Sequence, residues 1–289
     1  MKVRILGSGG SFGSPLAWQR NGKIDINNQR NFRTRSSVLV NIKETTSKSI
    51  KNISREFKKS LNEIADESDL KIEDIKKIDV KDSINILIDT SPDLRQQLYD
   101  AKCTQINTVL FTHGHSDHTS GLPDMRSISL INDKIIPAFA PIEMKKDFLS
   151  HYKFIFQGDK DYRPFMEFNT VQNEFQINNI KIESFKHNHG SIDVQTYRIG
   201  NFAYSTDLKK FYNNDIDKLK NLDLWVVGML RWDSHPSHAG FDEIMEYVNY
   251  LKPKKTIFTH MTALIDEKEL LNLCPQNVIP GYDGLEISI

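Results

Sequence analysis

Alternating and continuous runs of apolar residues divide the chain into predicted strands and helices. Residues 2–6, with the sequence KVRIL, alternate in the manner of a half-buried β-strand. The run INTVLFT at 106–112 is almost continuously apolar, which is typical of a strand buried on both faces. The same signals predict further strands at 36–42, 84–90, 180–186, 193–199, 202–206, 223–228, 255–259 and 285–289.

Helical patterns lie between these strands. The segment SPDLRQQLYDA, residues 91–101, begins with a serine and a proline, which are typical of a helix start. Other helices are expected at 118–130, 141–152, 208–220 and 239–251. Because strands and helices are mixed along a continuous chain without an internal repeat, we predict a layered α/β fold in a single domain spanning residues 1–289.

A highly charged stretch at 43–83 separates two of the predicted strands. Within it, Ile50, Ile53, Phe57 and Leu61 recur at helical spacing. We interpret this stretch as a surface insertion with one or two amphipathic helices, rather than as a second domain.

Composition and charge narrow the classes of protein that fit. Of the 289 residues, 38% are hydrophobic and 26% are charged, which indicates a globular protein. Basic and acidic residues number 38 each, so there is no global attraction to nucleic acid or to an anionic membrane. The only cysteines, Cys103 and Cys274, are far apart, which predicts no disulfide framework and a cytoplasmic location. No stretch approaches the roughly 20 apolar residues of a membrane span.

The segment HGHSDH at 113–118 places three histidines and an aspartate in one short turn. Imidazole nitrogen and carboxylate oxygen are ligands for divalent metals. Without a metal, imidazoles buried together would repel one another on protonation. One plausible geometry directs His113 and His115 to one ion, and Asp117 and His118 to a second ion. Two ions about 3.5–4 Å apart can act on both sides of a displacement at phosphorus.

Further donors follow later predicted strands. The segment KHNHGS offers His187 and His189, FAYSTD ends in Asp207, and TIFTH ends in His260. Each is a polar side chain at the end of an apolar strand, as a site at one edge of a sheet would require. A single histidine is usually structural, and we interpret His187 and His151 in that way.

The loop GSGGSFGSP at 7–15 is dense in glycine. It is no dinucleotide-binding fingerprint, because Gly7 and Gly9 fit the pattern but Phe12 stands at the third position. The loop is either a flexible turn or a segment whose backbone passes close to a ligand.

These motifs resemble the metallo-β-lactamase superfamily over nearly the full length of the chain. THGHSDH matches the signature of that superfamily, and ILIDTSPDLRQQL is similar to its early strand, which here ends in Asp89. The resemblance implies an αββα four-layer sandwich with a dinuclear metal site at one edge of its two sheets. The nitrogen and oxygen donors include no thiolate, which suits two divalent ions, either Zn²⁺ or Mn²⁺.

The resemblance also implies a role for each donor. Seven side chains would hold the two ions: His113, His115 and His189 the first, Asp117, His118 and His260 the second, and Asp207 both. Asp89 would orient a ligand histidine through its free ring N–H.

Within the superfamily, LGSGGSFGSPLAW, RTRSSVLV and GYDGLEISI resemble the branch that holds the phosphoribosyl 1,2-cyclic phosphate phosphodiesterases. This implies hydrolysis of a small cyclic or nucleotide-like phosphodiester by a hydroxide that bridges two ions. The segment SHPSHAGFDEI supplies His238 as the expected general acid, with a pKa near the operating pH, and Asp117 belongs to the same catalytic set. Arg231 and His235 are expected to hold a phosphate oxygen.

Several alternatives remain open at this stage. Hydrolysis of another ester or a thioester, RNA processing, and an accessory role like that of the pyrroloquinoline quinone biosynthesis protein all occur on similar motifs. Nucleic acid is less favoured because the net charge is zero. Relatives in the phosphodiesterase branch carry cysteines for a structural zinc, which AWQRNGKIDINNQRNF lacks. We expect a small phosphodiester as the partner and no membrane, and we leave a homodimer open.

Overall fold

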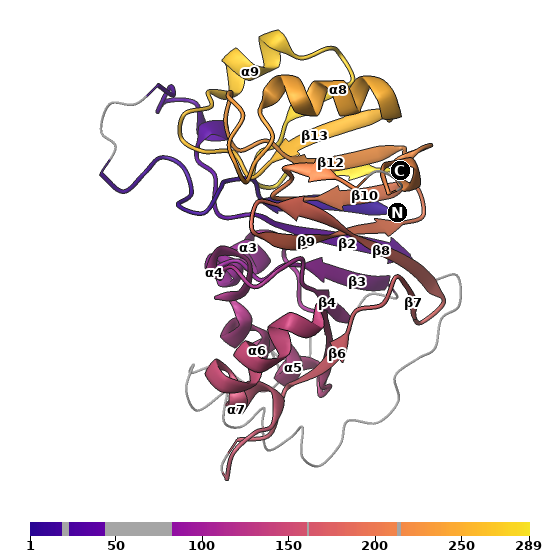
Figure 1. Ribbon diagram of the computed structural model, residues 1–289. Helices are drawn as coiled ribbons and strands as arrows, with labels where there is room; N and C mark the ends of the chain where they lie inside the picture. The colour runs from indigo at the N-terminus through magenta and orange to yellow at the C-terminus, as the bar shows by residue number, and fades with distance from the viewer. Residues whose placement is uncertain (19–22, 44–82, 161, 213–214) are drawn as a thin grey trace.

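The computed structural model describes residues 1–18, 23–43, 83–160, 162–212 and 215–289. Two β-sheets lie face to face, and helices cover their outer sides (Figure 1). The predicted αββα four-layer sandwich is therefore confirmed. Residues 44–82 of the proposed insertion lie outside the described residues, so the insertion and the single domain stay predictions.

The first sheet has seven strands, and helices cover its outer face. In sheet order the strands are β15 (Glu286–Ser288), β1 (Lys2–Gly7), β2 (Ser37–Lys43), β3 (Ser83–Ile88), β4 (Thr108–Leu110), β5 (Ile136–Ala140) and β6 (Met166–Thr170). Its helices are α3 (Leu94–Asp100), α4 (Ser116–Thr119), α5 (Met125–Asn132), α6 (Lys145–His151) and α7 (Lys153–Phe156).

The second sheet has eight strands, and two helices cover its outer face. In sheet order the strands are β11 (Lys210–Phe211), β8 (Ile180–His189), β9 (Ile192–Ile199), β10 (Phe202–Ser205), β12 (Leu224–Gly228), β13 (Lys255–Thr259) and β14 (Val278–Pro280), and β7 (Glu174–Ile177) pairs with β8. The helices are α8 (Phe241–Leu251) and α9 (Glu267–Leu273).

Three apolar cores fill the three spaces between the four layers. Alternation along a single strand shows how this arises, since successive side chains of a strand point to opposite faces. In β2, Val38 and Val40 belong to the core between the sheets, whereas Leu39 belongs to the core that also contains Leu94 and Leu98 of α3. The third core lies between the second sheet and α8 and α9.

Every predicted strand is present, with small differences at the ends. Five short strands were not predicted: β5, β6, β7, β11 and β14. The sequence of β5, IPAFA, contains Pro137, which cannot donate to a ladder and lowers the strand signal. These strands depend on pairing with neighbours more than on a long local pattern.

Two predicted helices need correction. The helix at 208–220 is wrong, because the described part of this region forms β11 and a 3₁₀ turn at Ile216–Leu219. The helix at 118–130 is interrupted, since α4 ends at Thr119 and α5 begins at Met125. Gly121 lies between them, where an added Cβ would fall 2.1 Å from the Ser91 carbonyl oxygen.

Polar contacts attach the segment before β2 to the segment before α9. The Asn31 amide donates to Asp266 Oδ2 at 2.7 Å, and the buried Arg33 guanidinium donates to the carbonyl oxygens of Ile265 at 2.7 Å and Thr262 at 3.0 Å. These contacts join the segment that follows the glycine loop to the segment that follows His260.

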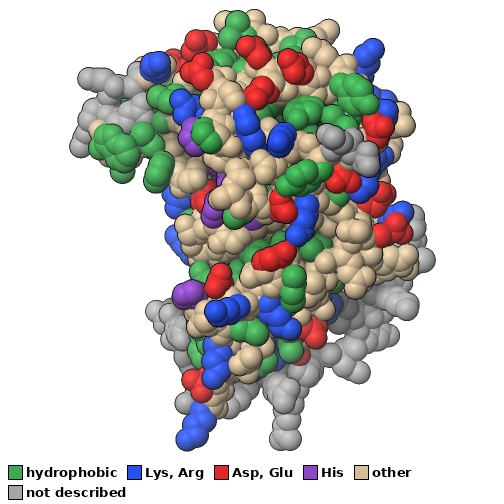
Figure 2. All heavy atoms as spheres, viewed as in Figure 1, with side chains coloured by type: hydrophobic (Ala, Val, Ile, Leu, Met, Phe, Trp, Pro, Cys, Tyr) green, Lys and Arg blue, Asp and Glu red, His purple; other side chains and the backbone are tan. Residues whose placement is uncertain are grey.

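No helix in the described ranges is long and apolar enough to cross a membrane. On the face drawn in Figure 2, acidic and basic side chains are interspersed. This mixture gives that face no broad area of positive charge for a nucleic acid backbone.

Candidate metal centre

The histidines and aspartates singled out in the sequence lie at the carboxyl ends of strands from both sheets. The segment HGHSDH follows β4 and runs into α4, at one edge of the sandwich (Figure 1). His189 is the last residue of β8, while Asp207 and His260 closely follow β10 and β13. Because these three strands point the same way in one sheet, their ends share one edge.

Three of these strand ends turn sharply. Asp89, Asp207 and His260 have positive φ angles of 62°, 52° and 58°. This left-handed conformation is uncommon for residues other than glycine, and such strain is concentrated at functional sites. The sequence carries no glycine or asparagine signal for these turns, so they could not be predicted from it.

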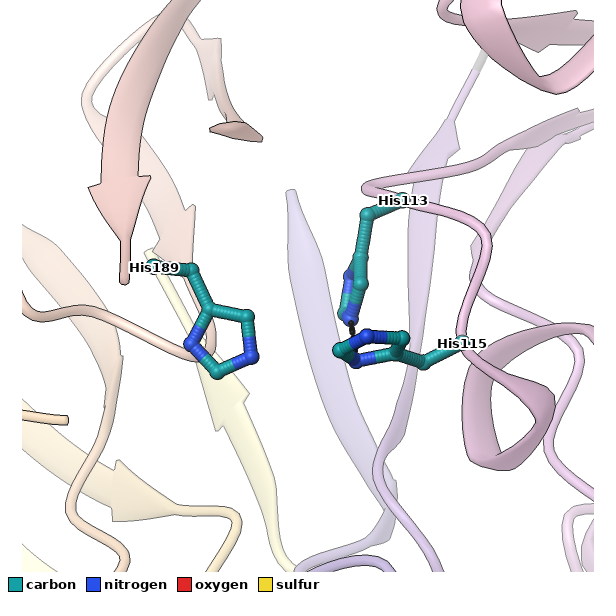
Figure 3. A group of neighbouring side chains, drawn as sticks. All are labelled: His113, His115 and His189. Atoms are coloured by element: carbon teal, nitrogen blue, oxygen red, sulfur yellow. Dashed lines mark hydrogen bonds between the residues drawn. The ribbon is translucent and has the colours of Figure 1, made fainter. Parts of the chain in front are cut away.

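His113, His115 and His189 form the first group (Figure 3). Their rings point toward one another, His113 and His115 from the turn after β4 and His189 from β8. His113 Nε2 lies 2.9 Å from His115 Nδ1, and the His115 and His189 ring centres are 5.3 Å apart. His189 Nδ1 donates to the Ser237 carbonyl oxygen at 2.8 Å, and His113 Nδ1 is 3.0 Å from Thr112 Oγ1.

Asp117, His118 and His260 form the second group. Asp117 Oδ2 lies 3.4 Å from His118 Nε2 and 3.3 Å from His260 Nε2. The three side chains are almost fully buried.

Asp207 lies between the two groups. Its Oδ2 is 3.2 Å from His118 Nε2 and 3.5 Å from His260 Nε2, on the side of the second group. Its Oδ1 is 3.7 Å from His189 Nε2, on the side of the first group. Each carboxylate oxygen therefore faces a different group, as a bridging ligand requires.

The donor spacing fits a metal ion. Two donors each about 2.1 Å from a tetrahedral ion are about 3.4 Å apart. The four separations between the Nε2 atoms of His118 and His260 and the Oδ2 atoms of Asp117 and Asp207 are 3.2, 3.3, 3.4 and 3.5 Å. His118 Nε2 is buried close to two carboxylates, yet it makes no hydrogen bond. An orphaned nitrogen in this position fits a cation between the donors better than a direct contact.

Asp89 orients His118 from behind. Its Oδ2 lies 2.8 Å from His118 Nδ1, and the carboxylate also accepts hydrogen bonds from Thr112 N and Oγ1 at 2.8 Å each. Asp89 and His118 are both fully buried. This arrangement matches the orienting contact expected for Asp89, and it adds Thr112, which the sequence reasoning missed.

Burial and mutual contacts set the ionisation of the centre. Burial raises the pKa of Asp207, but His260 and His118 hold it well below the usual value. Burial lowers the pKa of His118, but Asp89 and Asp207 raise it well above the usual value. Burial, together with His118, holds the pKa of His113 well below normal, so its ring stays neutral. Ionised carboxylates and neutral imidazole are the forms that bind metal, so Asp207 and His113 are already in that form, whereas an ion would have to displace the proton that the two carboxylates favour on His118.

His238 approaches this centre from the loop before α8. Its ring centre is 4.5 Å from that of His189, and its Nε2 is 3.9 Å from Asp207 Oδ1. Burial lowers the pKa of His238 to about 3, although Asp207 raises it. The prediction of a pKa near the operating pH is therefore wrong for the protein without substrate.

The two expected phosphate-binding residues lie near this loop. His235 is exposed, its ring centre is 6.0 Å from that of His238, and its Nδ1 is 2.9 Å from Ser237 Oγ. Arg231 is half-buried and forms no hydrogen bond or ion pair with the part of the chain that the structure describes. His235 is thus placed beside His238, whereas no contact links Arg231 to the centre.

The two histidines interpreted as structural lie apart from the donor groups. His187 is fully buried, with Nδ1 2.9 Å from Thr196 Oγ1 and Nε2 donating to the Thr206 carbonyl oxygen at 2.8 Å. Burial lowers its pKa to about 4. His151 is exposed at the end of α6.

The glycine loop passes close to the backbone beside His260. Gly10 N donates to the Met261 carbonyl oxygen at 2.9 Å, and Met261 N donates to the Ser8 carbonyl oxygen at 2.9 Å. A Cβ on Gly9 would lie 2.7 Å from the Arg33 carbonyl oxygen. Gly9 therefore allows close backbone approach to the segment before β2, while a Cβ on Gly10 would lie 3.4 Å from the His260 carbonyl oxygen.

Comparison with known sequences identifies the family. A family model described as Beta-lactamase superfamily domain matches residues 84–261, which include every donor discussed above. An octanoyltransferase of Porphyromonas gingivalis is 29% identical over 209 residues, which are 71% of this chain. The chain spans 42% of the length of that curated relative.

Solved structures share the fold along the whole chain. A diphosphatase from the PhnP family has a TM-score of 0.79 at 24% identity, covering 99% of this chain and 96% of its own. Zn²⁺-bound PqqB from Methylobacterium extorquens has a TM-score of 0.70 at 16% identity, with both chains fully covered. The short form of human tRNase Z has a TM-score of 0.64 at 16% identity, covering 100% of this chain and 99% of its own. With the sequence match, the architecture and the histidine–aspartate edge in agreement, the chain belongs to the metallo-β-lactamase superfamily of metal-dependent hydrolases.

Proposed function

We propose that the protein is a two-metal phosphodiesterase that hydrolyses a small cyclic or nucleotide-like phosphodiester. The observation that carries this proposal is the position of Asp207. Its two oxygens face two separate donor groups, 3.2 Å from His118 Nε2 on one side and 3.7 Å from His189 Nε2 on the other. An arrangement of this kind suits two ions that share one ligand, which is the arrangement that enzymes acting at phosphorus use.

The seven proposed ligands divide as the donor groups do. The first ion would be held by His113, His115 and His189, the second by Asp117, His118 and His260, and both by Asp207. The donors are nitrogen and oxygen with no thiolate, which supports Zn²⁺ or Mn²⁺. When bound, two such ions lower the pKa of a water molecule and neutralise charge on the phosphodiester and its transition state.

The remaining residues of the proposed site act on the substrate or on a ligand. Asp89 holds His118 in one ring orientation. His235 and Arg231 bind phosphate oxygens, since neither is engaged by another charged group in the described part of the chain.

His238 acts on the leaving oxygen. Its neutral ring can donate a hydrogen bond to that oxygen. A bound phosphate anion raises the pKa of a neighbouring imidazole, because opposite charge favours the protonated form. His238 can then pass a proton to the leaving alkoxide as the P–O bond breaks.

The relatives support phosphate esters as substrates, with one specific exception. The diphosphatase and tRNase Z are named for reactions at phosphate, and both share this fold. The octanoyltransferase suggests an acyl ester or thioester instead, although the chain spans only 42% of that protein. Hydrolysis of an acyl thioester is therefore the second candidate function.

A substrate panel on metal-reconstituted protein tests the proposal. It contains a cyclic phosphoribosyl phosphate, a 2′,3′-cyclic nucleotide, bis-p-nitrophenyl phosphate, a short RNA and an octanoyl thioester. We expect turnover of the cyclic phosphodiesters. Turnover of the thioester alone would favour the second candidate, and no turnover of any compound by protein holding two ions would favour an accessory role.

His238→Ala sharpens this test. We expect turnover of the cyclic phosphodiesters to fall by about 10²- to 10⁴-fold, because their alkoxide leaving groups need a proton. Bis-p-nitrophenyl phosphate has a stable leaving group, so its loss should be much smaller, and metal content should not change. His151→Ala, an exposed histidine outside the donor groups, is the matched control. Equal losses on both kinds of phosphodiester would contradict the role given to His238.

A further inference from the structure

Asp283 lies in the turn between β14 and β15 and holds two segments from the start of the chain. Its Oδ1 accepts hydrogen bonds from Ser8 N and Ser8 Oγ, both at 2.9 Å. Its Oδ2 accepts from Thr34 N at 2.7 Å and from Thr34 Oγ1 at 2.6 Å. One carboxylate therefore fixes the glycine loop through Ser8 and the strand entry through Thr34.

The fixed glycine loop is bonded to the residue that follows a proposed metal ligand. Ser8 accepts a hydrogen bond from Met261 N, and Gly10 donates one to the Met261 carbonyl oxygen, both at 2.9 Å. Gly9 N also donates to the Thr34 carbonyl oxygen at 2.7 Å. Asp283, the Ser8–Gly10 segment and Met261 thus form one connected path to His260.

The ring orientation of His260 depends on its backbone more than the ring orientations of the other buried histidines of the centre do. In the described part of the chain, the Nδ1 atoms of His113, His118 and His189 each lie within hydrogen-bond distance of an orienting oxygen. His260 Nδ1 is buried and has no hydrogen-bond partner. Its φ of 58° is also a conformation that its neighbours must hold.

We propose that Asp283 is a positioning residue for the metal ligand His260, acting through the Ser8–Gly10 segment and Met261. This inference rests on the proposed two-metal site. Asp283 touches no donor of that site, so it sets the angle of the His260 ring only by fixing the adjacent backbone. Ligand-orienting contacts of other histidines act directly on the ring, whereas this one acts on the main chain.

The test is Asp283→Asn, with the two zinc affinities measured by titration against a competing chelator. Asparagine keeps the shape of the side chain but has only one acceptor oxygen for the four donors. We expect binding of one ion to weaken by about 10- to 100-fold, as is typical when a ligand loses its orienting contact, while the other ion binds as before. Asp117→Asn identifies which of the two affinities belongs to the second group.

Asp266→Asn is the matched control. Asp266 also accepts four hydrogen bonds, from Asp25 N, Asn31 Nδ2, Lys268 N and Glu269 N, and none of these donors belongs to the Ser8–Gly10 segment. Thermal unfolding of the metal-free proteins measures the structural cost of each variant. We expect Asp266→Asn to lower the melting temperature and to leave both zinc affinities unchanged.

Three outcomes would overturn the inference. The first is wild-type affinity for both ions in Asp283→Asn, and the second is an equal weakening in Asp283→Asn and Asp266→Asn. If Asp283→Asn does not fold, Ser8→Ala is used instead, because it removes one of the four hydrogen bonds to Asp283 and should weaken the binding of the same ion by a smaller factor. Wild-type affinity for both ions in Ser8→Ala would be the third outcome. A wild-type protein that binds fewer than two ions would instead overturn the proposed two-metal function, and this inference with it.

Discussion

The candidate centre shows how a few individual residues set the chemistry of a buried cluster. Asp207 has one oxygen for each donor group, and His118 has a nitrogen near two carboxylates without a hydrogen bond. Asp89 supports His118 from the opposite side of the ring. An imidazole held in this way has one orientation and one tautomer, which increases its basicity toward a metal.

Asp89→Asn tests this support at the residue scale. Asparagine tolerates the positive φ of 62° and keeps the size of the side chain. It lacks the negative charge that faces the Nδ1 atom of the His118 ring. We expect zinc affinity at the second group to fall by about 10- to 100-fold and turnover to fall with it. Metal content after dialysis against a weak chelator measures the change. Wild-type metal retention in the variant would show that Asp89 does not tune His118.

At the scale of elements, the loop between β12 and α8 brings His238 to the centre. Lys209 Nζ donates to Ser234 Oγ at 2.6 Å and to Glu243 Oε1 at 3.0 Å. Glu243 Oε2 in turn accepts from Gly240 N at 2.7 Å, at the start of α8. The loop is therefore tied to the segment after β10 and to the first turn of the helix.

Lys209→Met removes both lysine contacts and should loosen this loop. Because the ion pair is partly exposed, its direct contribution to stability is about 0–1 kcal/mol, so the melting temperature should change little. We expect kcat/KM on cyclic phosphodiesters to fall by about 5-fold, roughly 1 kcal/mol, and to fall less on bis-p-nitrophenyl phosphate. Lys186→Met, which breaks the exposed pair with Glu143, is the control. Equal losses in the two variants would contradict a positioning role for Lys209.

At the scale of the whole molecule, the centre joins the two sheets. Four of the proposed ligands follow β4 of the first sheet, and the other three lie at or just after the ends of strands of the second sheet: His189, Asp207 and His260. Ions bound to this edge would stabilise the sandwich as well as serve the reaction, because they bind the folded arrangement and not the separated ligands.

Metal removal tests this coupling. Free ion at about 1,000 times its Kd adds about 4 kcal/mol of stability. At about 2–4 °C per kcal/mol, this corresponds to a rise in Tm of roughly 8–16 °C. Differential scanning calorimetry of chelator-stripped and zinc-reconstituted protein measures the shift, and Asp207→Ala, which lacks the shared ligand, should show a smaller one. Equal Tm values with and without zinc would contradict the coupling.

The sequence by itself determined most of the strands of both sheets, the donor-rich turn at 113–118 and the candidate donors at later strand ends. These features are local, since hydrophobic periodicity and ligand spacing are set by neighbouring residues. The helix predicted at 208–220 failed because the edge strand β11 depends on its pairing with β8. The short strand β14 likewise depends on its parallel pairing with β13.

Only the tertiary structure decided how the donors meet. Which oxygen of Asp207 faces which group, the left-handed turns at strand ends, and the link from Asp283 to His260 all join residues far apart in the chain. The burial that lowers the pKa of His238 also comes from packing, and a loop sequence does not encode it locally. A local pattern can place a donor at the end of a strand, but its direction and ionisation depend on contacts made only when both sheets are assembled.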